Sequence, residues 1–141
     1  MKISETNLDL LVSKMCFLCD FLDSTYHIND GGCCFIAYCI ARLLDKDKIP
    51  YSVAVYHCDC DNFNDLDCSH NHYAIYVNNV LINGFEDDDD FTIMDNVTST
   101  DLLNHYKECG WNNYYNKKKN DFLFHIINKF YNDFKKDLPK R

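Results

Sequence analysis

Apolar residues recur along the chain at two different spacings, one typical of helices and one typical of strands. In four segments they return every three or four positions, which predicts amphipathic helices. These segments are residues 5–22, 33–46, 98–109 and 121–136. The segment 33–46 is apolar nearly all round. We therefore expect that helix to be central and buried.

Between the second and third helices the chain is rich in β-branched and aromatic residues, which favour strands. The predicted strands cover residues 51–56, 72–77, 80–85 and 91–94. Two asparagines at 78–79 predict a two-residue hairpin turn. In that register the paired residue numbers sum to 157, so His72 faces Phe85 and Asn83 faces Ala74. The pattern predicts an α+β fold in a single domain over 1–141, with the helix at 33–46 packed on a small antiparallel sheet and extra helices at both ends.

The composition limits the kinds of partner that the protein can have and indicates its cellular compartment. The chain has 141 residues, a net charge of −8 and nine cysteines. The negative charge argues against a nucleic-acid partner. The polar, acidic residues 4–9 do not form a signal peptide, and no apolar run is long enough to span a bilayer. We expect a cytoplasmic protein with reduced thiols. An abundance of Asn, Asp, Lys and Tyr with no Gln indicates an AT-rich phage or bacterial genome.

The strongest candidate for chemistry is the stretch Gly31-Gly32-Cys33-Cys34, which opens the second predicted helix. Unpaired N–H groups and the helix dipole at a helix start favour the thiolate, which is the nucleophilic form of cysteine. Glycines before it allow a sharp turn and close approach of a substrate. The alternative is that both cysteines are small apolar core residues. Cys33 shares a face with Ile36 and Ile40, which suggests a core position for Cys33, but the spacing does not settle which of the two cysteines is the nucleophile.

A cysteine nucleophile needs a base within hydrogen-bond reach and a third group that orients the base. In the predicted register His72 and Asn83 are diagonal neighbours on one face of the hairpin. A shift of one residue would undo this pairing. His70 competes with His72 as the base, but His72 lies within the predicted strand and is better held.

The same residues carry a family resemblance. Gly31-Gly32-Cys33-Cys34-Phe35 resembles the Gly-Gly-x-Cys-Phe element of arylamine N-acetyltransferases. The order of helix-start Cys, His strand and Asn83-Gly84-Phe85 resembles the transglutaminase-like branch of the papain-like superfamily. The resemblance covers about residues 30–85. It implies a papain-like core with Cys34 as nucleophile, His72 as base and Asn83 as orienting residue.

The chain also departs from the family pattern. Asn83 stands where the family usually has Asp, and Gly84 follows it without the intervening residue of the acetyltransferase motif. The upstream Gln that lines the oxyanion hole of papain-like proteases is missing, and Asn29 is the nearest substitute. The chain is too short for a full arylamine acetyltransferase, so a transglutaminase-like core is the better match.

These features predict a thiol hydrolase that uses a Cys-His-Asn triad without a cofactor. Its substrate would be a protein or a small amide or thioester, cleaved as by a protease, deamidase or related amidase. The alternative is a catalytically inactive papain-like binding protein, for example a phage effector that sequesters a host protein or small ligand. The sequence leaves the oligomeric state open.

A third interpretation concerns a metal. The polar segment 57–72 contains a dense group of potential zinc ligands. The tetrahedral set would be Cys58, Cys60, Cys68 and His70. Their spacing differs from the common C-x₂-C patterns. A structural zinc would make the chain a zinc-stabilised interaction module, and it is also compatible with catalysis because it could position His72.

Overall fold

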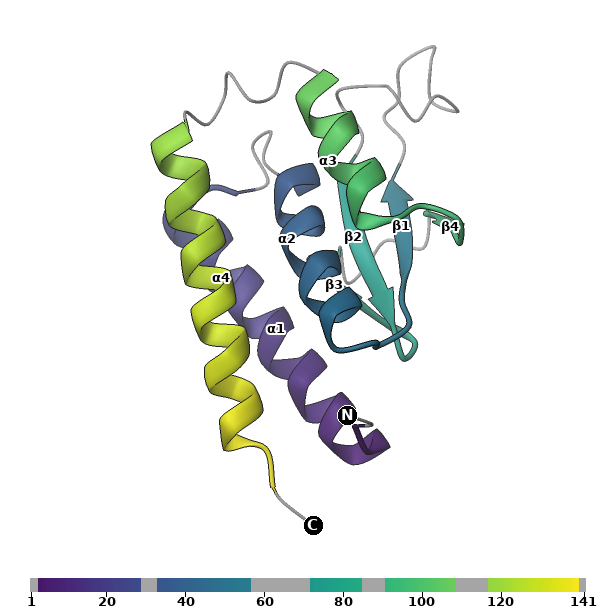
Figure 1. Ribbon diagram of the computed structural model, residues 1–141, viewed down its shortest axis with the longest axis vertical. Helices are drawn as coiled ribbons and strands as arrows, with labels where there is room; N and C mark the ends of the chain where they lie inside the picture. Colours follow the sequence, from purple (N-terminus) through teal and green to yellow (C-terminus); the bar gives the residue numbers. More distant parts are fainter. Residues whose placement is uncertain (1–2, 29–32, 57–71, 85–90, 109–116, 140–141) are drawn as a thin grey trace.

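The structure is a computed structural model that describes residues 3–28, 33–56, 72–84, 91–108 and 117–139 (Figure 1). Its elements, in chain order, are α1 (Glu5–Tyr26), α2 (Cys33–Lys46), β1 (Ser52–Tyr56), β2 (His72–Val77), β3 (Val80–Ile82), β4 (Thr92–Met94), α3 (Ser99–Glu108) and α4 (Lys117–Asp137). The predicted α+β class is confirmed. The bounds of α2 and β2 agree with the prediction to the residue.

The sheet is antiparallel, with the strand order β3-β2-β1-β4. In the hairpin Ile75 pairs with Ile82 and Val77 pairs with Val80, so the predicted register is confirmed over the paired residues. Asn78 and Asn79 have φ angles of 53° and 65°. Two successive left-handed residues are the geometry of a type I′ turn, whose twist matches that of the flanking strands.

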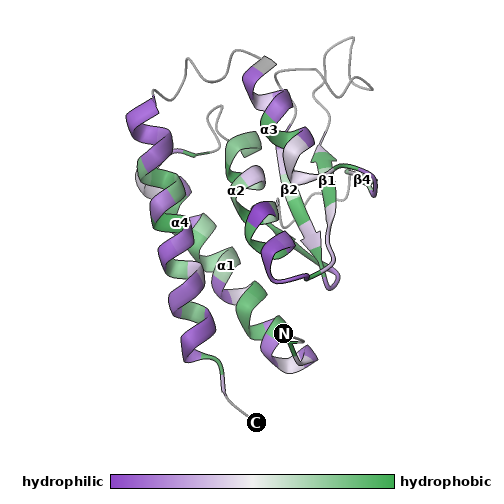
Figure 2. Ribbon diagram, viewed as in Figure 1, coloured by the Kyte–Doolittle hydropathy of each residue, from purple (hydrophilic) through white to green (hydrophobic). Residues whose placement is uncertain are grey.

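Helix α2 lies between the sheet and α4, and α1, which runs antiparallel to α4, contacts both α4 and the edge strand β3 (Figure 1). Figure 2 shows that α2, β1 and β2 carry the most hydrophobic segments, whereas much of α4 is hydrophilic. Ile36 and Ile40 of α2 are almost completely buried. The prediction of a central, buried helix is confirmed. Among the described helices, none combines the length and hydropathy needed to cross a bilayer.

Three predicted boundaries were wrong, and each has a local cause. Helix α1 continues past residue 22 and ends where His27 takes a left-handed φ of 54° and donates its N–H to the carbonyl of Asp23. Strand β3 ends at Ile82 instead of 85, because Asn83 has a φ of 66°, which a strand does not accommodate. Helix α4 begins at 117 instead of 121, and its first turn carries an ion pair of 2.9 Å between Lys117 and Asp121.

The other differences are small. The strands predicted from 51 and 91 begin one residue later, and the described part of the third helix spans 99–108 instead of 98–109. Residue 109 lies outside the described residues.

Helix α4 is held to the turn after α2 by a polar cluster. Asp47 accepts hydrogen bonds from Tyr131 Oη at 2.6 Å and from Lys135 Nζ at 2.7 Å. Burial alone would raise the pKa of the Asp47 carboxyl, but these two hydrogen bonds and the Lys135 charge lower it below its ordinary value. This cluster fixes α4 beside α2 at the end of the molecule away from the candidate site.

Candidate functional site

The start of α2, the end of β1 and the start of β2 lie at the same end of the molecule, and α3 runs past them (Figure 1). The residues singled out by the sequence, Cys33, Cys34, His72 and Asn83, are all buried there. The start of α2 and the open end of the β2–β3 hairpin are thus at one end of the molecule (Figure 1). The contacts of the individual side chains decide which of them can act together.

Cys34 is directed toward α3. Its Sγ–H donates to the backbone carbonyl of Leu102 at 3.3 Å, and the residue is only 2% exposed. A carbonyl partner holds the proton on sulfur, whereas the first turn of α2 favours the thiolate. A base that removes this proton would leave the thiolate in a favourable position. Cys33 is 7% exposed and occupies the same first turn.

His72 and Asn83 are brought together, but through the main chain. The Nε2 atom of His72 lies 2.6 Å from the carbonyl oxygen of Asn83. Because a carbonyl only accepts hydrogen bonds, Nε2 carries the proton and Nδ1 is the nitrogen that can accept one. Burial lowers the pKa of His72, while the Asn83 hydrogen bond and the charge of Asp23 oppose this, so the imidazole is neutral near pH 7.

Neighbouring residues of β2 face opposite sides of the sheet. The His72 ring lies 5.6 Å from the ring of Tyr56, which packs with Ala54 and Ala74 in a small apolar cluster. Tyr73 belongs instead to the main core that contains α2. The predicted catalytic residues therefore form two groups. His72 and Asn83 lie on the outer side of β2, and Cys34 lies on the inner side with α3. Their joint catalytic role stays a prediction.

A second buried histidine occupies the inner side. His105 Nε2 of α3 lies 2.6 Å from the hydroxyl oxygen of Tyr73, and both residues are buried. His105 follows Leu102 by three positions, so the two are neighbours on one face of α3, and Cys34 contacts that turn. The sequence interpretation passed over His105. The sequence signal that could have identified His105 is its position three residues after Leu102 in a predicted helix, on the same apolar face.

Several predicted site residues lie outside the described residues. These are Asn29, Gly31, Gly32 and the four zinc candidates Cys58, Cys60, Cys68 and His70. Within the described ranges there is no group of three or more His, Cys, Asp or Glu side chains that could hold a metal ion. The zinc prediction therefore stays a prediction.

Comparisons of this chain with protein-family models, with curated proteins and with solved structures found no match. The structure defines an α+β protein with a cysteine pair at the start of its central helix and a buried histidine on each side of the adjacent strand.

Proposed function

We propose that this chain is a cysteine-nucleophile acyl-transfer enzyme with a papain-like core, acting as a thiol hydrolase on an amide, ester or thioester. The observation that carries the proposal is the position of Cys34. It lies in the first turn of α2, and its thiol contacts the turn of α3 that bears the buried His105. A thiol, a helix start and an adjacent imidazole are the components of an activated cysteine.

The reaction needs four steps. A histidine nitrogen takes the Cys34 proton, and the thiolate attacks the substrate carbonyl carbon to form a tetrahedral oxyanion. The N–H groups in the first turn of a helix have no acceptor within the helix, so those of α2 can stabilise this oxyanion. The histidine then gives its proton to the leaving group, which leaves a thioester on Cys34. Water hydrolyses the thioester and releases the acid.

Two histidines compete as the base. The family resemblance assigns His72, whose tautomer is set by the Asn83 carbonyl and whose Nδ1 can accept a proton. The contacts of Cys34 favour His105, because it lies on the same side of β2 as the thiol. His105 can act as a base when its Nε2–H donates to the Tyr73 oxygen, since Nδ1 then holds the lone pair.

A binding protein without catalytic activity is the second candidate. It is favoured by the burial of Cys34 and by the donation of its thiol proton to Leu102, both of which are properties of an inert core cysteine. In this case the papain-like fold would present a surface or cavity to a ligand, and Cys34 would react like any buried thiol. Both candidates include a cytoplasmic location with reduced cysteines.

Incubation with p-nitrophenyl acetate tests the enzyme proposal. We expect acetylation of Cys34, located by peptide mass spectrometry, followed by continued release of p-nitrophenolate as the thioester hydrolyses. Cys34→Ser should abolish both signals. Cys39→Ser is the matched control, because Cys39 lies in the same helix and burial raises the pKa of its thiol. Acetylation that is unaffected by Cys34→Ser would refute the proposal.

A further inference from the structure

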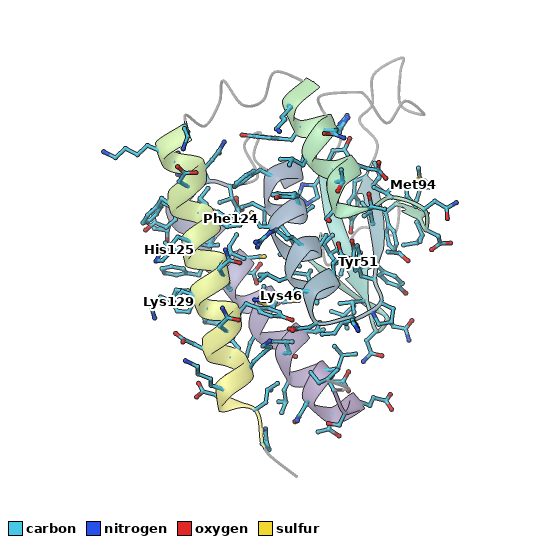
Figure 3. The ribbon with its side chains drawn as sticks, viewed as in Figure 1. Lys46, Tyr51, Met94, Phe124, His125 and Lys129 are labelled. Atoms are coloured by element: carbon cyan, nitrogen blue, oxygen red, sulfur yellow. The ribbon has the colours of Figure 1, made fainter. Side chains whose placement is uncertain are left out.

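A cavity of about 510 Å³ lies where α2, α3 and α4 meet. Its walls include the aromatic rings of Phe35 and Tyr38 from α2, Tyr106 from α3 and Phe124 from α4. Figure 3 shows Phe124 on the side of α4 that lies next to α2. A volume of this size is typical of sites for small molecules or single side chains. The hydrogen bonds of Asp47 with Tyr131 and Lys135 hold α4 to the turn after α2.

Two residues of the cavity wall are neighbours of Cys34 or of its hydrogen-bond partner along α2 and α3. Phe35 follows Cys34 directly, and Tyr106 lies one helical turn after Leu102, whose carbonyl accepts the Cys34 thiol proton. Burial raises the pKa of the Tyr106 hydroxyl, the hydrogen bond to Asn120 opposes this, and charge on Cys34 raises it further. The cavity wall therefore includes a direct neighbour of Cys34 in α2 and a residue one turn from its hydrogen-bond partner in α3.

The walls are suited to an aromatic ring. The Phe35 ring lies 5.3 Å from the Tyr106 ring and 6.1 Å from the Tyr38 ring, both at an interplanar angle of 44°. Tilted rings at such distances offer both faces and edges to a further ring. The Arg42 guanidinium lies 4.8 Å from the centre of the Phe124 ring. The cavity thus has four aromatic walls from three different helices.

The charged residues of the lining argue against a cationic ligand. Lys117 is paired with Asp121 at 2.9 Å, which leaves the exposed Lys107 as an additional positive charge. The Tyr106 hydroxyl donates to Asn120 Oδ1 at 3.3 Å. An uncharged aromatic ring needs no partner for a buried charge, so it fits this lining better than a lysine or arginine side chain.

We propose that this cavity binds an aromatic side chain of a peptide-like substrate, next to the carbonyl group that Cys34 attacks. The attack by Cys34 rests on the proposed function, whereas binding of the ring does not. The chemical class is that of phenylalanine or tyrosine residues in amide linkage. The cavity would give the hydrolase a preference for aromatic over small or basic residues.

Binding is tested on the full chain carrying Cys34→Ser, which lacks the candidate nucleophilic thiol. N-acetyl-phenylalaninamide is titrated against ¹⁵N-labelled protein and followed by NMR, with N-acetyl-glycinamide as the ring-free probe. We expect saturable shifts at the amides of α2, α3 and α4 that line the cavity, with at least tenfold weaker binding of the glycine probe. No saturable binding of the phenylalanine probe, or equal binding of both probes, would overturn the proposal.

Filling the cavity gives a second readout. Leu103 is half-buried and lines the cavity, so Leu103→Trp should weaken the phenylalanine probe at least tenfold. Leu10→Trp is the matched control, since Leu10 lies on α1 and is 39% exposed. If Leu103→Trp fails to fold, Lys107→Trp fills the cavity from an exposed position. Wild-type affinity in a folded filling variant would overturn the proposal.

The two proposals fail separately. Binding of the aromatic probe without acetylation of Cys34 by p-nitrophenyl acetate would support the cavity and refute the enzyme. Acetylation without aromatic binding would support the enzyme and refute the cavity.

Discussion

The two sides of strand β2 hold two buried histidines in different ways. On the outer side, the carbonyl of Asn83 sets the proton of His72 on Nε2. On the inner side, the hydroxyl of Tyr73 can either donate to or accept from His105. The thiol of Cys34 is found on the inner side, against α3. The tautomer of His72 is therefore better defined, whereas His105 lies on the same side of β2 as the candidate nucleophile Cys34.

This difference shows how strongly strand alternation separates neighbours in sequence. His72 and Tyr73 are adjacent in the chain, yet they contribute to different clusters because successive strand residues face opposite sides. A motif that lists a cysteine, a histidine and an asparagine in order does not decide which side of the sheet each will occupy.

The largest expected effect separates the two bases. His105→Gln should slow acetylation of Cys34 by p-nitrophenyl acetate by about 10²–10⁴-fold, the usual contribution of a general base. His72→Gln should leave the rate within about threefold, because His72 lies on the other side of β2. Stopped-flow release of p-nitrophenolate measures both rates. The reverse ranking would show that the resemblance, and not the contacts of Cys34, identifies the base.

The next effect concerns stability on the inner side. Tyr73→Phe removes the hydroxyl partner of the buried His105, and an unsatisfied buried group costs about 1–3 kcal/mol. Tyr76→Phe is the matched control in the same strand, since its hydroxyl makes an exposed hydrogen bond of 3.3 Å to Asn79. That change should stay within about 0.5 kcal/mol. Urea unfolding gives both values, and equal losses would show that the Tyr73–His105 contact has no special weight.

On the outer side, the backbone conformation and the carbonyl group of Asn83 matter more than its side chain. Asn83 has a φ of 66°, and its main-chain carbonyl holds His72. Asn83→Val should cost about 1–2 kcal/mol, because a β-branched residue is strained in this conformation. Asn83→Gly should change stability by less than about 1 kcal/mol and keep the His72 Nε2–H resonance in the NMR spectrum. Loss of that resonance in the glycine variant would mean that the Asn side chain orients the ring.

The smallest effect is a pH dependence from His72. Its pKa is lower in the folded protein than the ordinary value of about 6.5, so the unfolded chain binds the proton first. The neutral His72 imidazole therefore makes its full contribution to the free energy of unfolding above about pH 6.5. This contribution is lost as the pH falls toward the pKa of His72 in the folded protein. The free energy of unfolding should drop more for wild type than for His72→Gln between about pH 7.5 and about pH 5.5. Parallel curves would contradict this sign.

Much of the fold could be predicted because its signals are local. The apolar pattern over 33–46 and the Asn-Asn turn at 78–79 determine α2, β2 and the hairpin register. Two of the three wrong boundaries depend on single residues. His27 and Asn83 adopt positive φ, and asparagine and histidine do so only in some contexts.

The site was less predictable because its contacts join distant positions. Tyr73 and His105 are separated by 32 positions, and Cys34 and Leu102 by 68. No spacing rule links such pairs. The hairpin register predicted that His72 and Asn83 are neighbours. It could not predict that His72 contacts the backbone carbonyl of Asn83, because this contact depends on where β3 ends.

The most direct test of the account is the reactivity of Cys34 itself. Folded protein is alkylated with iodoacetamide over a range of pH, and each cysteine is followed by peptide mass spectrometry. The account predicts that Cys34 reacts in the folded state with a midpoint below the ordinary thiol pKa of about 8.5, while buried Cys39 reacts only after unfolding. Reaction at Cys33 instead would move the nucleophile by one residue. Protection of Cys34 to the same extent as Cys39 would contradict the account and leave the binding protein as the better description.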